Sequence, residues 1–199
     1  TIASSKDFDK NKLKEYGINP EQPYILFMMG SLGSSSVAKV IDESLGGINE
    51  NVQILVVHGK ANEYVFKTQE NDRIHIVPYV DGLTTLKYAK LAICRAGATT
   101  LSEIMALGVA SILVPSPYVT ENHQYKNAMD LVREDAALLL EEKDLEGDTL
   151  QRMVEKILND KPFTNKMKNN LKKFEVNNSA TIIYDEIVKL VGNKDERNN

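Results

Sequence analysis

The sequence is poor in cysteine and in long apolar runs. Cys94 is the only cysteine among the 199 residues, so the chain cannot form an internal disulfide. Its position in a short apolar segment is typical of a small core residue, and its spacing from the three histidines indicates no metal site. No segment approaches the about 20 consecutive apolar residues of a membrane-spanning helix, and no signal peptide is recognisable.

The charge balance argues against another class of protein. The net charge is −4, and basic and aromatic residues form no common platform, which disfavours a nucleic-acid-binding surface. A hydrophobic content of 42% and a charged content of 26% are ordinary for a soluble globular domain. The chain begins Thr-Ile-Ala-Ser rather than with methionine, so we expect it to be part of a longer protein.

Length and polarity along the chain predict one domain with short extensions. Residues 1–22 are mostly polar, apart from a short helix expected over 10–16, and are predicted to be a lead-in or linker. The domain is expected to span residues 23–192. The polar residues 193–199 are expected to form a disordered tail.

Short apolar runs alternate with helical patterns through the domain. Six of these runs have the length of buried strands, and they cover residues 24–28, 52–57, 74–77, 91–94, 111–114 and 136–140. This order is typical of an α/β fold. We predict a Rossmann-like parallel sheet of about six strands with helices on both faces.

The turns that follow four of these strands are expected to form one pocket. In parallel sheets, ligands bind beyond the carboxyl ends of the strands. The turns after Met28, Val77, Cys94 and Val114 would all open on that edge.

The stretch over residues 91–128 has the most informative pattern. A strand is followed by a turn of small residues at 95–98 and by a helix that starts at Thr99 or Thr100, with Gly108 placed to end it. Free N–H groups at such a helix start, together with the helix dipole, are typical of an anion site.

Two charged residues beside this turn each have two interpretations. Glu103 can stabilise the first helical turn as an N-terminal charge, which base rates favour, or it can accept hydrogen bonds from a sugar diol. Arg95 can add positive charge to the anion site or serve packing.

The turn after Met28 has a weaker pattern. Gly30 and Gly33 lie between a strand and a helix, but they match neither the dinucleotide fingerprint nor a P-loop. A tight structural turn and a phosphate site fit these residues equally well.

An ordered set of segments resembles a known family. RAGATTLSE, ALG, an apolar strand, PSPY and NHQYKNA follow one another over residues 95–128. Together they are similar to the donor-binding signature of the MurG family of bacterial peptidoglycan glycosyltransferases, in glycosyltransferase family 28. The resemblance covers residues 23–137 and implies one half of a GT-B fold, the carboxyl-terminal donor-binding half.

The resemblance also implies a site for UDP-N-acetylglucosamine. Val80 would read uracil through its main-chain amide, and Glu103 would hold the ribose hydroxyls. Gln124 suits hexose hydroxyls, whereas His123 stands where the family often has glutamine. The full set of implied donor-binding residues is Ser31, Val80, Gly97, Ala98, Thr99, Thr100, Glu103, His123, Gln124 and Asn127.

The activity that the resemblance implies is transfer of N-acetylglucosamine to lipid I, which forms lipid II at the cytoplasmic face of the bacterial cell membrane. The family's amino-terminal half supplies the acceptor site and the catalytic base, and nothing here matches that half, so this chain contains no expected catalytic residue. No Asp-x-Asp pair occurs, so no metal cofactor is expected. The expected partners are UDP-N-acetylglucosamine and the missing half with lipid I, through which most membrane contact would occur.

Other interpretations remain open at this point. One half of a UDP-N-acetylglucosamine 2-epimerase would share the fold, although its later loop usually carries an Arg-Thr-Glu pattern that residues 117–128 lack. A non-catalytic donor-binding subunit with a separate membrane partner, or a fold that has lost its ligand, would also fit. The lysine-rich stretch over 161–173 can meet anionic lipid headgroups or form a solvated face.

Overall fold

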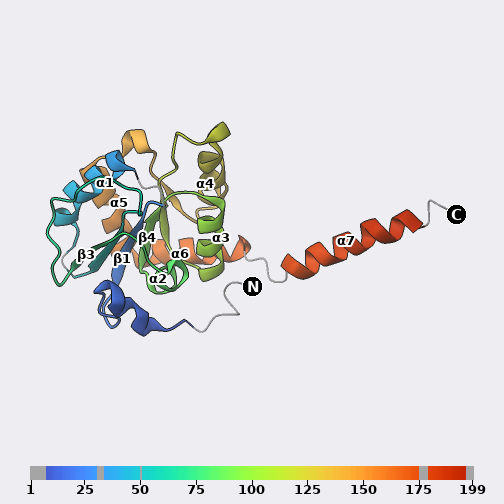
Figure 1. The fold of residues 1–199 in the computed structure, drawn as a ribbon, viewed down its shortest axis with the longest axis horizontal. Helices are drawn as coiled ribbons and strands as arrows, with labels where there is room; N and C mark the ends of the chain where they lie inside the picture. Colours follow the sequence, from blue (N-terminus) through green and yellow to red (C-terminus); the bar gives the residue numbers. More distant parts are fainter. Residues whose placement is uncertain (1–7, 31–33, 50, 175–178, 196–199) are drawn as a thin grey trace.

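Six parallel strands form the centre of the molecule (Figure 1). The computed structural model describes residues 8–30, 34–49, 51–174 and 179–195. The strands are β1 (Tyr24–Met28), β2 (Gln53–Val57), β3 (Ile74–Val77), β4 (Leu91–Cys94), β5 (Ser111–Leu113) and β6 (Leu138–Leu139). They pair in the order β3-β2-β1-β4-β5-β6, which is a doubly wound order of the Rossmann type. This confirms the predicted fold class.

Helices connect the strands and continue beyond the last one. The α-helices are α1 (Ser35–Ser44), α2 (Gly82–Tyr88), α3 (Ala98–Leu107), α4 (His123–Arg133), α5 (Gly147–Asn159), α6 (Lys161–Leu171) and α7 (Ser179–Asp195). The 3-10 helices are η1 (Lys10–Tyr16), η2 (Leu45–Gly47), η3 (Thr120–Asn122), η4 (Glu142–Asp144) and η5 (Lys172–Phe174).

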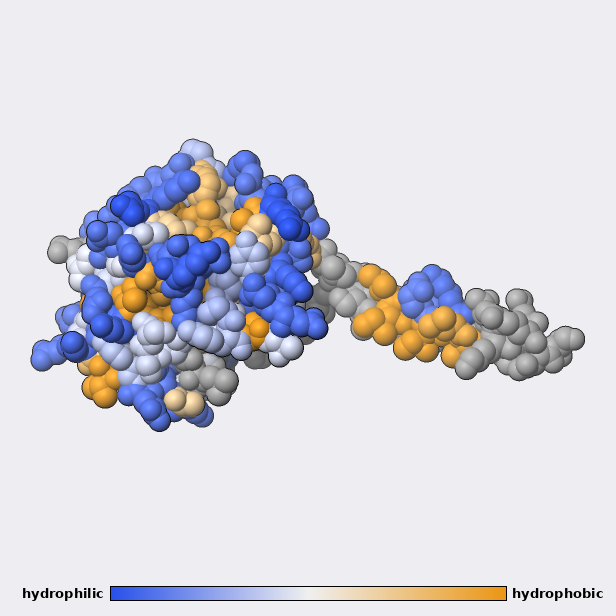
Figure 2. All heavy atoms as spheres, turned by 90° about the horizontal axis from the view of Figure 1, so that it is seen from above, coloured by the Kyte–Doolittle hydropathy of each residue, from blue (hydrophilic) through white to orange (hydrophobic). Residues whose placement is uncertain are grey.

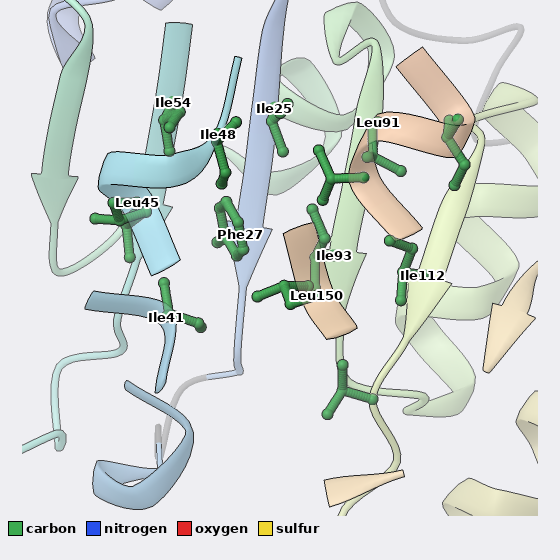
Figure 3. Close-up of a cluster of buried hydrophobic side chains, with 14 of the residues drawn as sticks. Ile25, Phe27, Ile41, Leu45, Ile48, Ile54, Leu91, Ile93, Ile112 and Leu150 are labelled. Atoms are coloured by element: carbon green, nitrogen blue, oxygen red, sulfur yellow. The ribbon is translucent and has the colours of Figure 1, made fainter. Parts of the chain in front are cut away.

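The strands bury both of their faces. Figure 3 shows Ile25 and Phe27 of β1 in a cluster that also holds Ile41 of α1 and Leu150 of α5. Leu26, between them in the sequence, enters the opposite cluster with residues of α2, α3 and α4. Helices therefore cover both faces, and this is why the central strands β1 and β4 are continuous apolar runs rather than alternating ones.

Residues 8–22, part of the predicted lead-in, pack against the second of these clusters. Leu13 and Ile18 are buried in it, with exposed fractions of 0% and 1%. η1 coincides with the expected short helix and ends at Gly17, which has a left-handed φ of 81°. A Cβ at Gly17 would lie 2.2 Å from the His75 ring, so both conformation and space require glycine there. The domain boundary at residue 22 remains a prediction.

α7 stands apart from the sheet and the other helices (Figure 1). Figure 2 shows apolar side chains exposed along it. Those at least 50% exposed are Ile182, Ile183, Tyr184, Ile187, Val188, Leu190 and Val191. In the part of the chain that the structure describes, no helix is long and apolar enough to cross a membrane. α7 continues to Asp195 and so includes the first residues of the predicted tail.

A buried carboxylate on α1 holds the long connection between β2 and β3. Asp42 is 5% exposed and accepts hydrogen bonds from the N–H groups of Lys67 (2.7 Å) and Thr68 (3.0 Å) and from the Tyr64 hydroxyl (2.8 Å). Burial by itself raises the pKa of Asp42, but the hydrogen bonds from Thr68, Lys67 and Tyr64 outweigh it, so the pKa lies below its ordinary value of 3.8. The carboxylate fixes a connection that has no regular secondary structure.

We expect Asp42→Asn to lower the free energy of unfolding by about 2–3 kcal/mol near neutral pH, because a buried N–H donor then loses its acceptor. Urea unfolding of both proteins measures the difference. It should shrink as the pH falls through the lowered pKa of Asp42, since a carboxylate with a depressed pKa stabilises the fold above its ordinary pKa and loses that contribution on protonation.

The matched control is Glu43→Gln on the same helix. Glu43 is exposed and its carboxylate lies 4.0 Å from Lys39, so the substitution should change the unfolding free energy by less than about 0.5 kcal/mol. Equal losses in the two variants would contradict a special role for Asp42.

Candidate functional site

The carboxyl ends of neighbouring strands meet at one edge of the sheet. Met28 at the end of β1 is in register with Val57 of β2 and with Cys94 of β4, which is in register with Leu113 of β5. The turns that the sequence predicted to share a pocket therefore follow strand ends that lie side by side. Ser31, in the turn after β1, lies outside the described residues.

The start of α3 offers backbone donors to this edge. Gly97 is the N-cap, and no side chain caps the helix. The first N–H groups of a helix have no partner within it, so those of Ala98, Thr99 and Thr100 are available to an anion. A Cβ at Gly97 would meet no atom within 4 Å, so the space around the turn is open. The helix dipole adds positive potential at the same place.

Glu103 lies in the second turn of α3, not in the first. The helix begins at Ala98, earlier than expected, and its first turn holds no acidic residue. The stabilising effect of a negative charge fades beyond the first turn, so the interpretation of Glu103 as an N-terminal helix charge is wrong. Burial raises the pKa of Glu103, and the Asp81 carboxylate raises it further. Since Asp81 is the N-cap of α2, the charge at the start of that helix acts on Glu103.

Val80 can contribute only its backbone to a ligand. Its side chain is 4% exposed and belongs to the second core cluster. Beside it, a pocket of about 320 Å³ lies between the strand ends of β1, β2 and β3, and Tyr79 at its rim is 65% exposed. The Lys60 ammonium lies 4.7 Å from the centre of the Tyr79 ring. The residues around this pocket are Met28, Gly30, Val57, Gly59, Lys60, Pro78, Tyr79, Val80 and Gly82.

The loop that leads into α4 is held by its own hydrogen bonds. The backbone N–H of Ser116 donates to Gln124 Oε1 (2.9 Å), and His123 Nδ1 lies 2.9 Å from the Thr120 carbonyl oxygen. Glu121 and Asn122 both adopt the left-handed region, with φ values of 54° and 52°. The Gln124 carbonyl oxygen is thus engaged, and its NH₂ group is the part left for a ligand.

Asn127 lies one turn further along α4 and borders a different hollow. A groove of about 560 Å³ runs between α3 and α4, and Asn127 lines it together with Ala98, Leu101, Met105 and Leu131. The groove therefore starts at the amino-terminal end of α3, so Asn127 shares a surface with Ala98 and not with Val80.

Arg95 does not face an open anion site. It is 9% exposed, and its Nη1 donates to Glu142 Oε2 (2.9 Å) and to the Val114 carbonyl oxygen (3.2 Å). Of the two interpretations, the structure favours packing. Sequence reasoning missed Glu142, which follows Arg95 by 47 residues and lies in an acidic stretch where no pattern distinguishes it.

The remaining charged and metal-binding candidates have local explanations. Lys166 and Lys173 of the lysine-rich stretch pair with Asp135 (2.9 Å) and Glu134 (2.8 Å), which favours a solvated face. Burial and the charge of Glu103 raise the pKa of Cys94 to about 12, as befits a buried core thiol. Among the described residues, no three His, Cys, Asp or Glu side chains gather as metal ligands would.

Several named enzymes are similar in sequence to most of the chain. An enzyme of Latilactobacillus sakei subsp. sakei is 34% identical over 187 residues, which cover 90% of this chain and 52% of the relative. One of Thermoanaerobacter sp. is 36% identical over 181 residues, which cover 86% of this chain and 50% of the relative. Both are named UDP-N-acetylglucosamine–N-acetylmuramyl-(pentapeptide) pyrophosphoryl-undecaprenol N-acetylglucosamine transferase. The chain spans about half the length of these curated relatives.

Solved structures share the fold. The crystal structure of Acinetobacter baumannii MurG superposes with a TM-score of 0.73 at 23% identity and covers 95% of this chain and 55% of that one. The spinosyn forosaminyltransferase SpnP gives a TM-score of 0.70 at 15% identity, with 90% of this chain and 46% of that one covered. These matches confirm the expected half of a GT-B fold. Residues 24–182 match the model of the glycosyltransferase family 28 C-terminal domain, and the chain therefore belongs to that family.

Proposed function

We propose that this chain is the donor-binding half of a hexosyltransferase that transfers N-acetylglucosamine from UDP to lipid I, giving lipid II for peptidoglycan. The observation that carries the proposal is the open amino-terminal end of α3, with Glu103 one turn further along, at the edge where the strand ends meet. Family membership and the names of the relatives support the reaction and the donor.

The diphosphate and the ribose occupy the start of α3 in this proposal. The N–H groups of Gly97, Ala98 and Thr99 and the Thr100 hydroxyl donate to the diphosphate. Glu103 accepts hydrogen bonds from the ribose hydroxyls, for which its half-buried carboxylate is placed one turn along the same helix.

In the proposal, the base and the hexose lie on either side of the start of α3. The Val80 main-chain amide reads uracil, since the Val80 side chain is committed to the core. The hexose lies toward the start of α4, where the Gln124 NH₂ group, His123 and Asn127 meet its hydroxyls. Ser31 completes the set from the turn after β1.

The chemical contribution of this half is stabilisation of the leaving group. Negative charge grows on the UDP diphosphate as its bond to the sugar breaks. Backbone donors that are already aimed at the diphosphate stabilise this charge without reorganising. No residue of this chain acts as the catalytic base in the proposal, and no metal cofactor is required of it.

The proposed partner is the amino-terminal half of the enzyme. The chain spans about half the length of its curated relatives, and the apolar side chains of α7 are exposed. We propose that the amino-terminal half covers α7, binds lipid I and provides most of the contact with the cytoplasmic face of the bacterial membrane. A contiguous exposed apolar face marks an interaction site in many proteins.

Calorimetric titration of the chain with UDP-N-acetylglucosamine tests the donor site. We expect saturable binding that is stronger than that of GDP-mannose, with UDP-galactose reporting on hexose selectivity. Glu103→Ala should weaken binding by about 1–3 kcal/mol, because the ribose hydroxyls lose a charged acceptor.

Glu155→Ala is the control for this titration. Glu155 is an exposed carboxylate on α5, so its removal should leave the affinity unchanged. Equal affinity of the Glu103→Ala variant and the unmodified chain would contradict the ribose contact. The same titration is repeated on the full-length enzyme. If neither the chain nor the full-length enzyme binds any uridine nucleotide, the donor site is contradicted.

The donor affinity should also depend on pH through Glu103. The pKa of Glu103 is raised above its ordinary value of 4.5, first by burial and then by Asp81, and only the ionised form is a full acceptor. The affinity for UDP-N-acetylglucosamine should therefore fall as the pH is lowered through this raised pKa. Glu103→Gln should flatten the profile, and Asp81→Asn should move its midpoint to lower pH. A profile unchanged in the Glu103→Gln variant would assign the titration to another group.

A further inference from the structure

One buried cation and one carboxylate connect several strand ends. Arg95 follows β4 directly, and its Nη1 donates to Glu142 Oε2 (2.9 Å) and to the Val114 carbonyl oxygen (3.2 Å). The second oxygen of Glu142, Oε1, accepts a hydrogen bond from the Ser36 hydroxyl (3.1 Å). Ser36 Oγ also lies 3.0 Å from Ser34 Oγ.

The members of this network belong to separate turns at the ligand edge. Ser36 lies in the first turn of α1, and Arg95 lies two residues before the N-cap of α3. Val114 directly follows β5 and leads into the 115–124 loop, and Glu142 begins η4. The network thus ties the start of α1 to the start of α3.

The link between Ser36 and Glu142 borders open space at that edge. A pocket of about 310 Å³ is lined by Ser36, Val37, Tyr118 and Glu142, among others. The ion pair itself is deeper, since the Arg95 and Glu142 side chains are each 11% exposed. The network therefore runs from the core to the open surface beside the start of α1.

Stability alone does not account for a pair of this kind. The free energy needed to remove two charges from water offsets much of their mutual attraction. Proteins in which apolar residues replace a buried ion pair are often just as stable. What a buried pair does supply is a defined geometry, because the guanidinium is a rigid fork and the carboxylate has two oxygens in fixed directions.

We propose that Arg95, Glu142 and Ser36 are positioning residues that set the spacing between the starts of α1 and α3, and thereby the diphosphate subsite. This inference rests on the proposed function. Arg95 stays on Glu142 when the donor binds and does not become a phosphate ligand. In the opposite arrangement, the diphosphate takes Arg95 away from Glu142. Removing the Glu142 charge would then strengthen UDP binding rather than weaken it.

The test compares UDP with uridine, which lacks the phosphates. UDP binding is measured by calorimetry and uridine binding by NMR chemical-shift titration. We expect Glu142→Gln to weaken UDP binding about tenfold, as for loss of a charge-assisted hydrogen bond, and to leave uridine binding unchanged. Ser36→Ala should weaken UDP binding in the same direction by about threefold, as for a neutral hydrogen bond.

Two neighbouring substitutions serve as controls. Glu141→Gln removes an adjacent carboxylate that pairs with Lys143 at the surface (3.2 Å), and Ser35→Ala removes the hydroxyl that donates to Asn62 (3.3 Å). Both should retain the affinities of the unmodified chain. Thermal unfolding of each variant is measured first, and if Glu142→Gln does not fold, Ser36→Ala decides, because Ser36 is exposed.

Unchanged UDP binding by Glu142→Gln would overturn the positioning role. Tighter binding would also overturn it, since a released Arg95 would then be acting on the diphosphate itself. Equal losses for UDP and uridine would also overturn it, because they would indicate general loosening of the site. Failure of both the unmodified chain and the full-length enzyme to bind either ligand would overturn the proposed function instead, and it is seen before any variant is compared.

Discussion

The common direction of the six strands is the constraint on which the rest of the structure depends. Parallel strands require long crossover connections, most of which are helices here, and these helices bury both faces of the sheet. The buried strand residues are then almost all apolar, with Gln53 and Ser111 as the polar exceptions, so the groups that can meet a ligand lie in the turns. Because the strands also share a register, the turns after Met28, Cys94 and Leu113 lie at the same height. The candidate site is a direct consequence of this geometry.

The sheet could be predicted because its signal is local. A strand buried on both faces is a short apolar run in any context, and the runs at 24–28, 74–77 and 91–94 coincide with β1, β3 and β4. Helix starts were less predictable. A threonine was the expected first residue of α3, but Gly97 is the N-cap, and the helix begins early enough to move Glu103 into its second turn. This small shift removes the interpretation of Glu103 as a helix-stabilising charge.

Contacts between distant parts of the chain left no pattern in the sequence. Asp42 holds the residues around Thr68, and Arg95 meets Glu142 across 47 residues, yet each of these charges is ordinary in its own neighbourhood. The orientation of Asn127 depends on how α4 is rotated against α3, which no single helix encodes. The left-handed backbone at Glu121 and Asn122 could not be predicted, because neither residue is the glycine that usually indicates this conformation.

The start of α3 has a consequence for how this protein responds to selection. The groups proposed to hold the diphosphate are mostly main-chain amides, and a codon change replaces a side chain without removing an amide, proline excepted. An inhibitor that imitates the diphosphate would therefore contact atoms that point mutations leave in place. Resistance to such a compound would have to arise indirectly, from altered helix geometry or from higher enzyme abundance, and not from deletion of the contact.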